Sequence, residues 1–179
     1  MPRCSARAAP ACEAGRTASG VCLPLAVWPG LSTMQLNRFT DFGLRVMMYL
    51  TQCRDRAQPV TIPEIAERFQ ISRNHLVKVV HFLSQQGLVA ATRGKGGGLA
   101  LARPAESYRV GELVRLLEHQ GTLVDCADPP CALNGACRLA GALDEALRVF
   151  YAELDRHTLA ELVRQPTGAA IIKLHGRAA

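Results

Sequence analysis

The stretch that decides the fold runs from Thr61 to Gly87 and reads T-I-P-E-I-A-E-R-F-Q-I-S-R-N-H-L-V-K-V-V-H-F-L-S-Q-Q-G. Apolar residues recur at helical spacing in both halves of it. Pro63 suits the first turn of the first helix, and Ser72 suits the N-cap of the second. Two short helices joined by the tight turn F-Q-I-S form a helix-turn-helix, whose second helix enters the DNA major groove.

The residues after Gly87 change from helical to extended periodicity. Two short runs, 88–93 and 99–102, flank the sequence G-K-G-G-G, which predicts a two-stranded wing with a glycine tip. Arg93, Lys95 and Gly96 are then placed to approach phosphates. A nucleotide-binding phosphate loop is the alternative. It is disfavoured because Leu-Ala-Leu follows instead of Lys-Ser/Thr and a helix.

Further helices are expected on both sides of this region. One begins with Thr40 as its N-cap, one spans 110–118, a long one begins near Leu139, and a short one follows Thr158. The long one carries an apolar stripe, which is read as a subunit interface rather than as core: Leu139, Leu143, Leu147, Phe150 and Leu154. The fold class expected is mainly α with a small β wing: a winged helix-turn-helix plus a long C-terminal dimerisation helix.

The domain organisation follows from these patterns. Residues 1–33 lack periodicity and are rich in Ala, Pro, Gly, Ser and Arg, so we expect a disordered extension, with Met34 as the true translation start. Residues 34–109 form the DNA-binding domain, and residues 110–165 form a cluster-binding loop and dimerisation helix. Residues 166–179 are expected to be a flexible tail.

Positive charge is concentrated in the proposed DNA-binding domain. Residues 34–109 carry eleven Lys and Arg against five Asp and Glu, whereas residues 110–179 carry seven against nine. A polyanion is therefore attracted to the first of these segments. The candidate contacts at the start of the recognition helix are Ser72, Arg73, Asn74, His75 and Lys78.

Three cysteines, Cys126, Cys131 and Cys137, lie close together in D-C-A-D-P-P-C-A-L-N-G-A-C. The prolines and glycine break any regular element, so three thiolates can converge on one soft metal centre of zinc, copper(I) or iron and sulfur. The stretch 21–31 is too short and too broken by proline to be a signal core or a membrane span. We therefore expect a cytoplasmic protein without a membrane partner. In the reducing cytoplasm, clustered cysteines indicate a metal site rather than disulfides.

Several motifs together resemble the Rrf family of bacterial winged-helix regulators, with the closest likeness to its nitric-oxide-sensing branch. They are F-T-D-F-G-L-R, I-S-R-N-H-L-V-K-V-V, R-G-K-G-G-G and the three cysteines, all between Met34 and Arg164. The resemblance implies a homodimeric repressor that binds double-stranded DNA at a palindromic operator and releases it when nitric oxide attacks an iron-sulfur cluster. The cluster, [2Fe-2S] or [4Fe-4S], is implied on Cys126, Cys131 and Cys137.

The fourth ligand is also implied by the resemblance. A sister branch places a His three residues after the last cysteine, where this chain has Ala140. The nitric-oxide branch uses a carboxylate from the first helix of the partner subunit, and the matching residue is Asp41. Residue chemistry alone favours the other interpretation, that Asp41 is an acidic residue stabilised by the dipole of its helix. Asp125, Asp128 and a Cys3His zinc site with His119 stay open as alternatives.

Other function classes are weighed against this one. A regulator of the same fold that responds to iron, redox or zinc uses the same residues. An iron-sulfur enzyme or electron carrier is disfavoured, because ferredoxin spacing is absent from the sequence and no catalytic constellation is visible. We therefore expect no enzymatic activity. Cys53, on the first helix, is expected to be a small buried hydrophobe.

Overall fold

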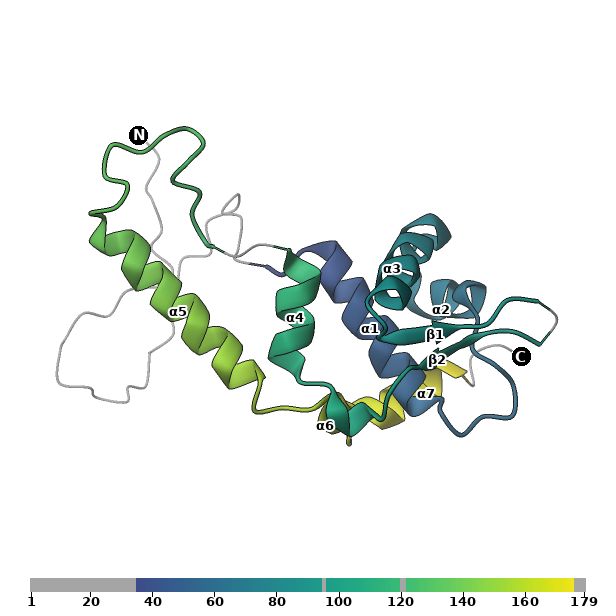
Figure 1. Ribbon diagram of the computed structural model, residues 1–179. Helices are drawn as coiled ribbons and strands as arrows, with labels where there is room; N and C mark the ends of the chain where they lie inside the picture. The colour runs from purple at the N-terminus through teal and green to yellow at the C-terminus, as the bar shows by residue number, and fades with distance from the viewer. Residues whose placement is uncertain (1–34, 95, 120–121, 176–179) are drawn as a thin grey trace, which may run out of the picture. The chain divides into compact units, whose positions relative to one another are not determined.

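The computed structural model describes residues 35–94, 96–119 and 122–175 (Figure 1). Helix α1 spans Arg38–Gln52 and begins two residues before Thr40, the expected N-cap. Asn37 is the N-cap, and its Oδ1 accepts a hydrogen bond from the Thr40 backbone N–H at 2.8 Å. The prediction of Thr40 as the cap is therefore wrong. Thr40 lies inside the helix and is fully buried.

The helix-turn-helix consists of α2 (Ile62–Phe69) and α3 (Arg73–Gln85). Thr61 caps α2 by accepting a hydrogen bond from the Glu64 N–H, and Gln70 ends it in the left-handed conformation. Ser72 occupies the N-cap position of α3 but makes no capping hydrogen bond through its side chain. Its hydroxyl thus takes no part in capping the helix.

Strands β1 (Val89–Ala91) and β2 (Leu99–Leu101) form the predicted wing, paired antiparallel with Val89 opposite Leu101. An isolated bridge adds Val60 beside Leu99, which ties the segment before α2 to the wing. Gly97 permits the sharp reversal at the tip, because a Cβ there would lie 2.2 Å from the Thr92 carbonyl oxygen. The small sheet and the three helices α1 to α3 adjoin one another (Figure 1).

The core of this region also includes residues from later in the chain. The short 3-10 helix η1 (Ala105–Ser107) leads into α4 (Val110–Glu118). The Tyr108 hydroxyl, almost fully buried, donates to the Leu88 carbonyl at 2.9 Å and accepts from the Arg103 N–H at 2.9 Å. Helix α6 (Leu159–Leu162), capped by Thr158 as expected, places Leu159 in the same core. Residues after the wing therefore complete the core around the helix-turn-helix.

Helix α5 (Arg138–Leu154) divides its apolar stripe between core and surface. Leu147 and Leu154 pack with Tyr151 against Val110 and Val114 of α4. By contrast, Leu139 is 66% exposed and Phe150 is 38% exposed. The interpretation of the whole stripe as a subunit interface is thus wrong for Leu147 and Leu154, which are partly buried against α4 of the same chain. The exposed members stay available to a second subunit.

The chain after α6 is not the expected flexible tail, because residues Thr167–His175 form helix α7. Ile171 of this helix is 4% exposed and belongs to the main core. The sequence prediction is wrong there because Ala and Ile in G-A-A-I-I-K support a helix that packs onto α1. The expectations for residues 1–33, for the start at Met34 and for Lys95 lie outside the described residues. Among the described helices, none combines the length and apolarity that a membrane span requires.

Candidate nucleic-acid interface and cysteine segment

The recognition helix α3 buries one face and exposes the other. Its buried face holds Leu76, Val79, Val80 and Leu83 against the core. All five predicted DNA contacts are exposed: Ser72, Arg73, Asn74, His75 and Lys78. They gather at the N-terminal end of the helix, the part that meets base edges in helix-turn-helix proteins.

Two further residues on this exposed face were not predicted from the sequence. Val77 and His81 are both exposed, and they follow Arg73 at intervals of four residues, so the three lie on one side of the helix. The spacing itself was the available signal. Val77 is an apolar residue in the middle of a polar face.

The wing tip provides a second exposed surface. Arg93, Gly94 and Gly96 are exposed, and both glycines have positive φ angles, +98° and +84°. This conformation suits glycine and leaves the tip backbone open on its outer side. The structure therefore supports the predicted accessibility of Arg93 and Gly96, while the side chain of Lys95 is not described.

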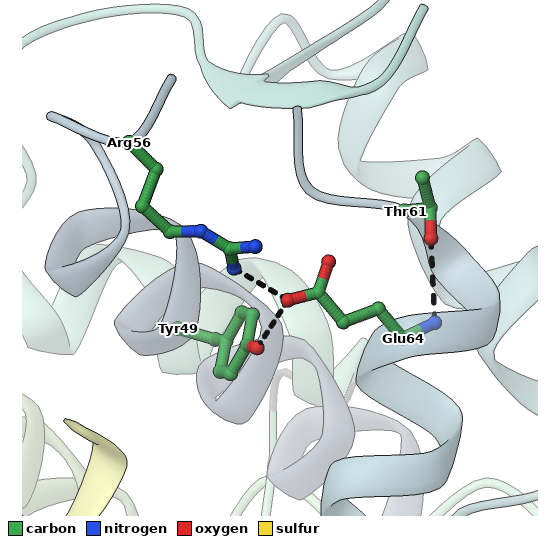
Figure 2. Close-up of polar contacts among 4 residues, drawn as sticks. All are labelled: Tyr49, Arg56, Thr61 and Glu64. Atoms are coloured by element: carbon green, nitrogen blue, oxygen red, sulfur yellow. Dashed lines mark hydrogen bonds and ion pairs between the residues drawn. The ribbon is translucent and has the colours of Figure 1, made fainter. Parts of the chain in front are cut away.

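The position of α2 relative to α1 is set by three polar side chains (Figure 2). One carboxylate oxygen of Glu64 accepts hydrogen bonds from the Tyr49 hydroxyl, at 2.7 Å, and from the Arg56 guanidinium. Burial raises the pKa of the Glu64 carboxyl, but the bonds from Arg56 and Tyr49 outweigh this and hold the pKa below its usual range. Burial and the neighbouring Glu64 raise the pKa of Tyr49. The helix-turn-helix is thus anchored to the core through a charged, satisfied network.

The cysteine segment connects α4 to α5, and its described residues, 119 and 122–136, form no helix or strand before Cys137, which is the N-cap residue of α5. The Cys131 N–H donates to the Cys126 carbonyl at 3.1 Å, which closes the turn between these two cysteines. Asp125 Oδ1 accepts from the backbone N–H groups of Ala127, at 2.8 Å, and Asp128, at 3.3 Å. Asp125, rather than Asp128, therefore stabilises this turn.

All three cysteines carry free thiols, with Cys131 exposed and the other two half-buried. Cys126 and Cys137 line one surface hollow together with Asn134, Arg138 and Ala140. Desolvation, followed by the negative charges of Cys131 and Cys137, raises the pKa of the Cys126 thiol. The three thiols thus lie in one short segment, and thiolates are a donor set that fits a soft, positively charged centre.

Nearness along the chain does not by itself arrange the three cysteines around a metal ion. Over the ranges that the structure describes, no three His, Cys, Asp or Glu side chains converge as they would around a metal ion. The single chain therefore supplies suitable donors in one segment without arranging them as a finished site. The assignment of Cys126, Cys131 and Cys137 as ligands stays a prediction.

The candidates for a fourth ligand lie in different surroundings. Asp41 forms an ion pair with Arg45 on its own helix at 2.8 Å, and both side chains are about two-fifths exposed, 41% and 43%. His119 stacks edge-on against Phe82, with ring centroids 4.8 Å apart, and packs beside Phe39. Asp41 is thus partly exposed, and His119 is also exposed although its ring contacts two aromatic residues, so both can be reached by another subunit.

The far end of α5 is fixed to α4. Arg115 pairs with Asp155 at 2.6 Å and lies over the Tyr151 ring, 4.7 Å from its centroid. Gly111 allows this approach, since a Cβ there would come within 2.4 Å of Asp155 Oδ1. Cys137 consequently begins a helix whose other end is fastened to the DNA-binding domain through α4.

Comparison with known proteins agrees with this architecture. Residues 36–165 match the sequence model of the Rrf2 family, described as an iron-dependent transcriptional regulator. Three solved structures are similar in fold. CymR, the global cysteine regulator of B. subtilis, has 24% identity and a TM-score of 0.59, and the match covers 73% of this chain and 96% of that one.

The other two are somewhat more similar in sequence. T. potens IscR has 26% identity and a TM-score of 0.59, over 73% of this chain and 86% of that one. The oxidized form of Staphylococcus aureus CymR has 26% identity and a TM-score of 0.57, over 73% and 97%. Because the family match spans most of the chain, including the helix-turn-helix, the wing and the cysteine segment, this protein belongs to the Rrf2 family of DNA-binding transcriptional regulators.

Proposed function

We propose that this regulator is a homodimeric repressor that senses nitric oxide through an iron-sulfur cluster held by Cys126, Cys131 and Cys137, as in repressors of the NsrR type. The cytoplasm is the compartment that fits three free thiols and a DNA target. Nuclearity, [2Fe-2S] or [4Fe-4S], is left to experiment.

The observation that carries this proposal is the position of three free thiols in one segment between α4 and α5. Thiolates are the usual ligands of iron-sulfur clusters, and the Rrf2 family is described as iron-dependent. When bound, such a cluster supplies iron to which nitric oxide binds. Ala140 offers no donor at the hollow that Cys126 and Cys137 line, so the fourth ligand must come from another residue.

Asp41 is the residue proposed for that fourth position, contributed to the cluster by the partner subunit. It lies in the first turn of α1, and α1 packs against the recognition helix α3. A ligand on α1 would therefore join the cysteine segment of one subunit to the helix-turn-helix of the other. The two recognition helices of a dimer must fit half-sites about one helical turn apart, so a small change in their separation weakens specific binding.

The experiment is anaerobic purification of the full chain, followed by absorption spectroscopy and analysis of iron, sulfide and zinc. The operator is then selected from random DNA with the metal-loaded protein, and binding is measured during titration with nitric oxide. We expect iron and sulfide, binding to a palindromic site, and release at a few equivalents of nitric oxide per cluster. Chelation of the iron should release the operator as well.

Two outcomes would contradict the proposal in different places. If iron is present and its removal releases the operator while nitric oxide has no effect, the regulator senses iron. If the metal-free protein binds the same site with equal affinity and nitric oxide changes nothing, the sensing proposal is wrong.

A second candidate is a regulator of the same fold that responds to thiol oxidation or zinc. The exposed Cys131, in a turn with Cys126, favours it, because an accessible thiol near a second thiol can form a disulfide. The similar CymR of S. aureus has itself been solved in an oxidized form. Free-thiol titration before and after mild oxidation, beside the metal analysis, separates the two candidates.

A further inference from the structure

We infer that Val77 reads the 5-methyl group of a thymine in each operator half-site. This inference rests on the proposed function in that α3 enters the major groove of a palindromic operator bound by a homodimer, and it is independent of the signal that the protein senses. Val77 is 46% exposed on α3. Among the residues of α3 it is the one exposed apolar side chain, since the other apolar residues are buried or half-buried.

The position of Val77 within α3 points to the bases. It is the fifth residue of the helix, one turn after Arg73 and directly before Lys78. Asn74, Lys78 and His81 surround it with exposed polar side chains. Cationic neighbours attract the phosphate backbone to this face, so an apolar group at its centre is desolvated when the helix enters the groove.

The chemistry of the major groove leaves one partner for such a group. Guanine, adenine and cytosine present hydrogen-bond donors and acceptors at their edges, whereas thymine adds an apolar methyl. A valine offers neither donor nor acceptor, and placing it against a polar edge costs free energy because that edge loses water. Packing against the thymine methyl removes apolar surface from water on both sides.

Valine is also suited to this task by its stiffness. In a helix a β-branched side chain has one strongly preferred χ1 rotamer, so its methyl groups point in one direction before DNA is bound. Little conformational entropy is lost on contact. Val77 therefore presents a fixed apolar surface that discriminates thymine from cytosine by shape and hydration.

The test uses the operator selected with the full-length, metal-loaded protein under anaerobic conditions. Each thymine of the half-site is replaced in turn by deoxyuridine, which removes the methyl and keeps every hydrogen-bonding group. Dissociation constants are measured for the wild type and for Val77→Ala, which changes an exposed side chain and should leave the fold intact. Circular dichroism and thermal unfolding verify that it does.

We expect one thymine per half-site at which the wild type loses about fourfold in affinity, the equivalent of one buried methyl group. Val77→Ala should bind the thymine operator more weakly than the wild type and should show no further loss with deoxyuridine at that position. Its salt dependence should match the wild type, because no phosphate contact is removed. The control Ile172→Ala, which truncates a side chain 52% exposed on α7, should lose affinity with deoxyuridine as the wild type does.

Three results would overturn the inference. The first is specific binding to an operator in which every deoxyuridine replacement is neutral, or in which Val77→Ala loses as much as the wild type at each one. The second is a selected half-site without thymine. The third is the enrichment of no sequence at all, which would overturn the assignment of α3 as a DNA reader together with the role of Val77.

Discussion

The carboxylate of Glu118, the last residue of α4, accepts two hydrogen bonds from Asn37, the N-cap of α1: one from the backbone N–H at 2.8 Å and one from the side-chain Nδ2 at 2.9 Å. The same Asn37 side chain caps α1 through its Oδ1. The helix that supports the recognition helix is thus joined to the residue that leads into the cysteine segment. This joint is a physical connection between the candidate sensor and the candidate DNA interface.

Removal of the acceptor should destabilise the protein. Glu118→Ala removes the carboxylate that accepts from the Asn37 N–H and Nδ2, and we expect a loss of about 1–3 kcal/mol in the free energy of unfolding. Glu118→Gln should lower the free energy of unfolding by less, because its amide oxygen can still accept one of the two hydrogen bonds from Asn37. Urea unfolding of both variants measures this, with Glu67→Ala, an exposed residue of α2, as the control. Equal stability of Glu118→Ala and the control would show that the joint contributes nothing.

The network of Tyr49, Arg56 and Glu64 should make stability depend on pH. The folded pKa of Glu64 lies below its ordinary value, so its contribution is present above the unfolded pKa of about 4.3 and disappears as the pH falls through the folded value. Glu64→Gln should cost about 1–3 kcal/mol at pH 7, because hydrogen bonds to a charged group are lost. The difference from the wild type should shrink below about pH 4. A difference that stays constant on acidification, in urea titrations at several pH values, would contradict this account.

Much of the DNA-binding domain could be predicted because its signals are local. Pro63 lies in the first turn of α2 and Thr158 caps α6 as expected, and the limits of α4 agree with the prediction. The glycine-rich turn indicated the wing, whose tip needs Gly97 for steric reasons. Each of these features depends on residues within a few positions of one another.

The features that could not be predicted depend on contacts between distant residues. Asn37 was missed as the cap because its position is fixed partly by Glu118, 81 residues away. Residues 167–175 were predicted to be a tail because their short helix is stabilised by the burial of Ile171 in a core formed by distant residues. The local sequence does not show that contact. The division of α5 between core and surface likewise follows from the packing of α4, which spacing alone does not reveal.

The cysteine assignment predicts that three thiols are required and one is dispensable. Replacement of Cys126, Cys131 or Cys137 by Ala should abolish the bound cluster, since a centre held by three thiolates cannot spare one. Cys53→Ala should retain it, because Cys53 is 5% exposed in the core. Iron and sulfide per chain, measured anaerobically, give the answer. Equal iron in all four variants would refute the assignment.

Replacement of Arg73 by Ala and replacement of Arg93 by Ala should weaken DNA binding in different ways. Arg73 lies at the start of the recognition helix, so its loss should cost about 1–3 kcal/mol on the true operator and relax specificity at one position. Arg93 lies at the exposed wing, so its loss should weaken all DNA similarly and lower the salt slope by about one. Binding measured at several salt concentrations on operator and random DNA distinguishes these patterns. An exchange of the two patterns would reverse the roles of helix and wing.

The role of Asp41 can be separated from its ion pair by comparing it with its own partner. Asp41 and Arg45 are four residues apart on α1, and both are more than one-third exposed, so the pair itself should contribute only about 0.3–0.5 kcal/mol to stability. If Asp41 acts only in this pair, Asp41→Ala and Arg45→Ala should have the same small effect and the same absorption spectrum. If Asp41 of the partner subunit completes the metal centre, Asp41→Ala alone should alter the spectrum, accelerate cluster loss and weaken operator binding, while Arg45→Ala keeps all three properties. Identical spectra and rates of iron loss in the two variants would exclude Asp41 as a ligand and direct the search to His119.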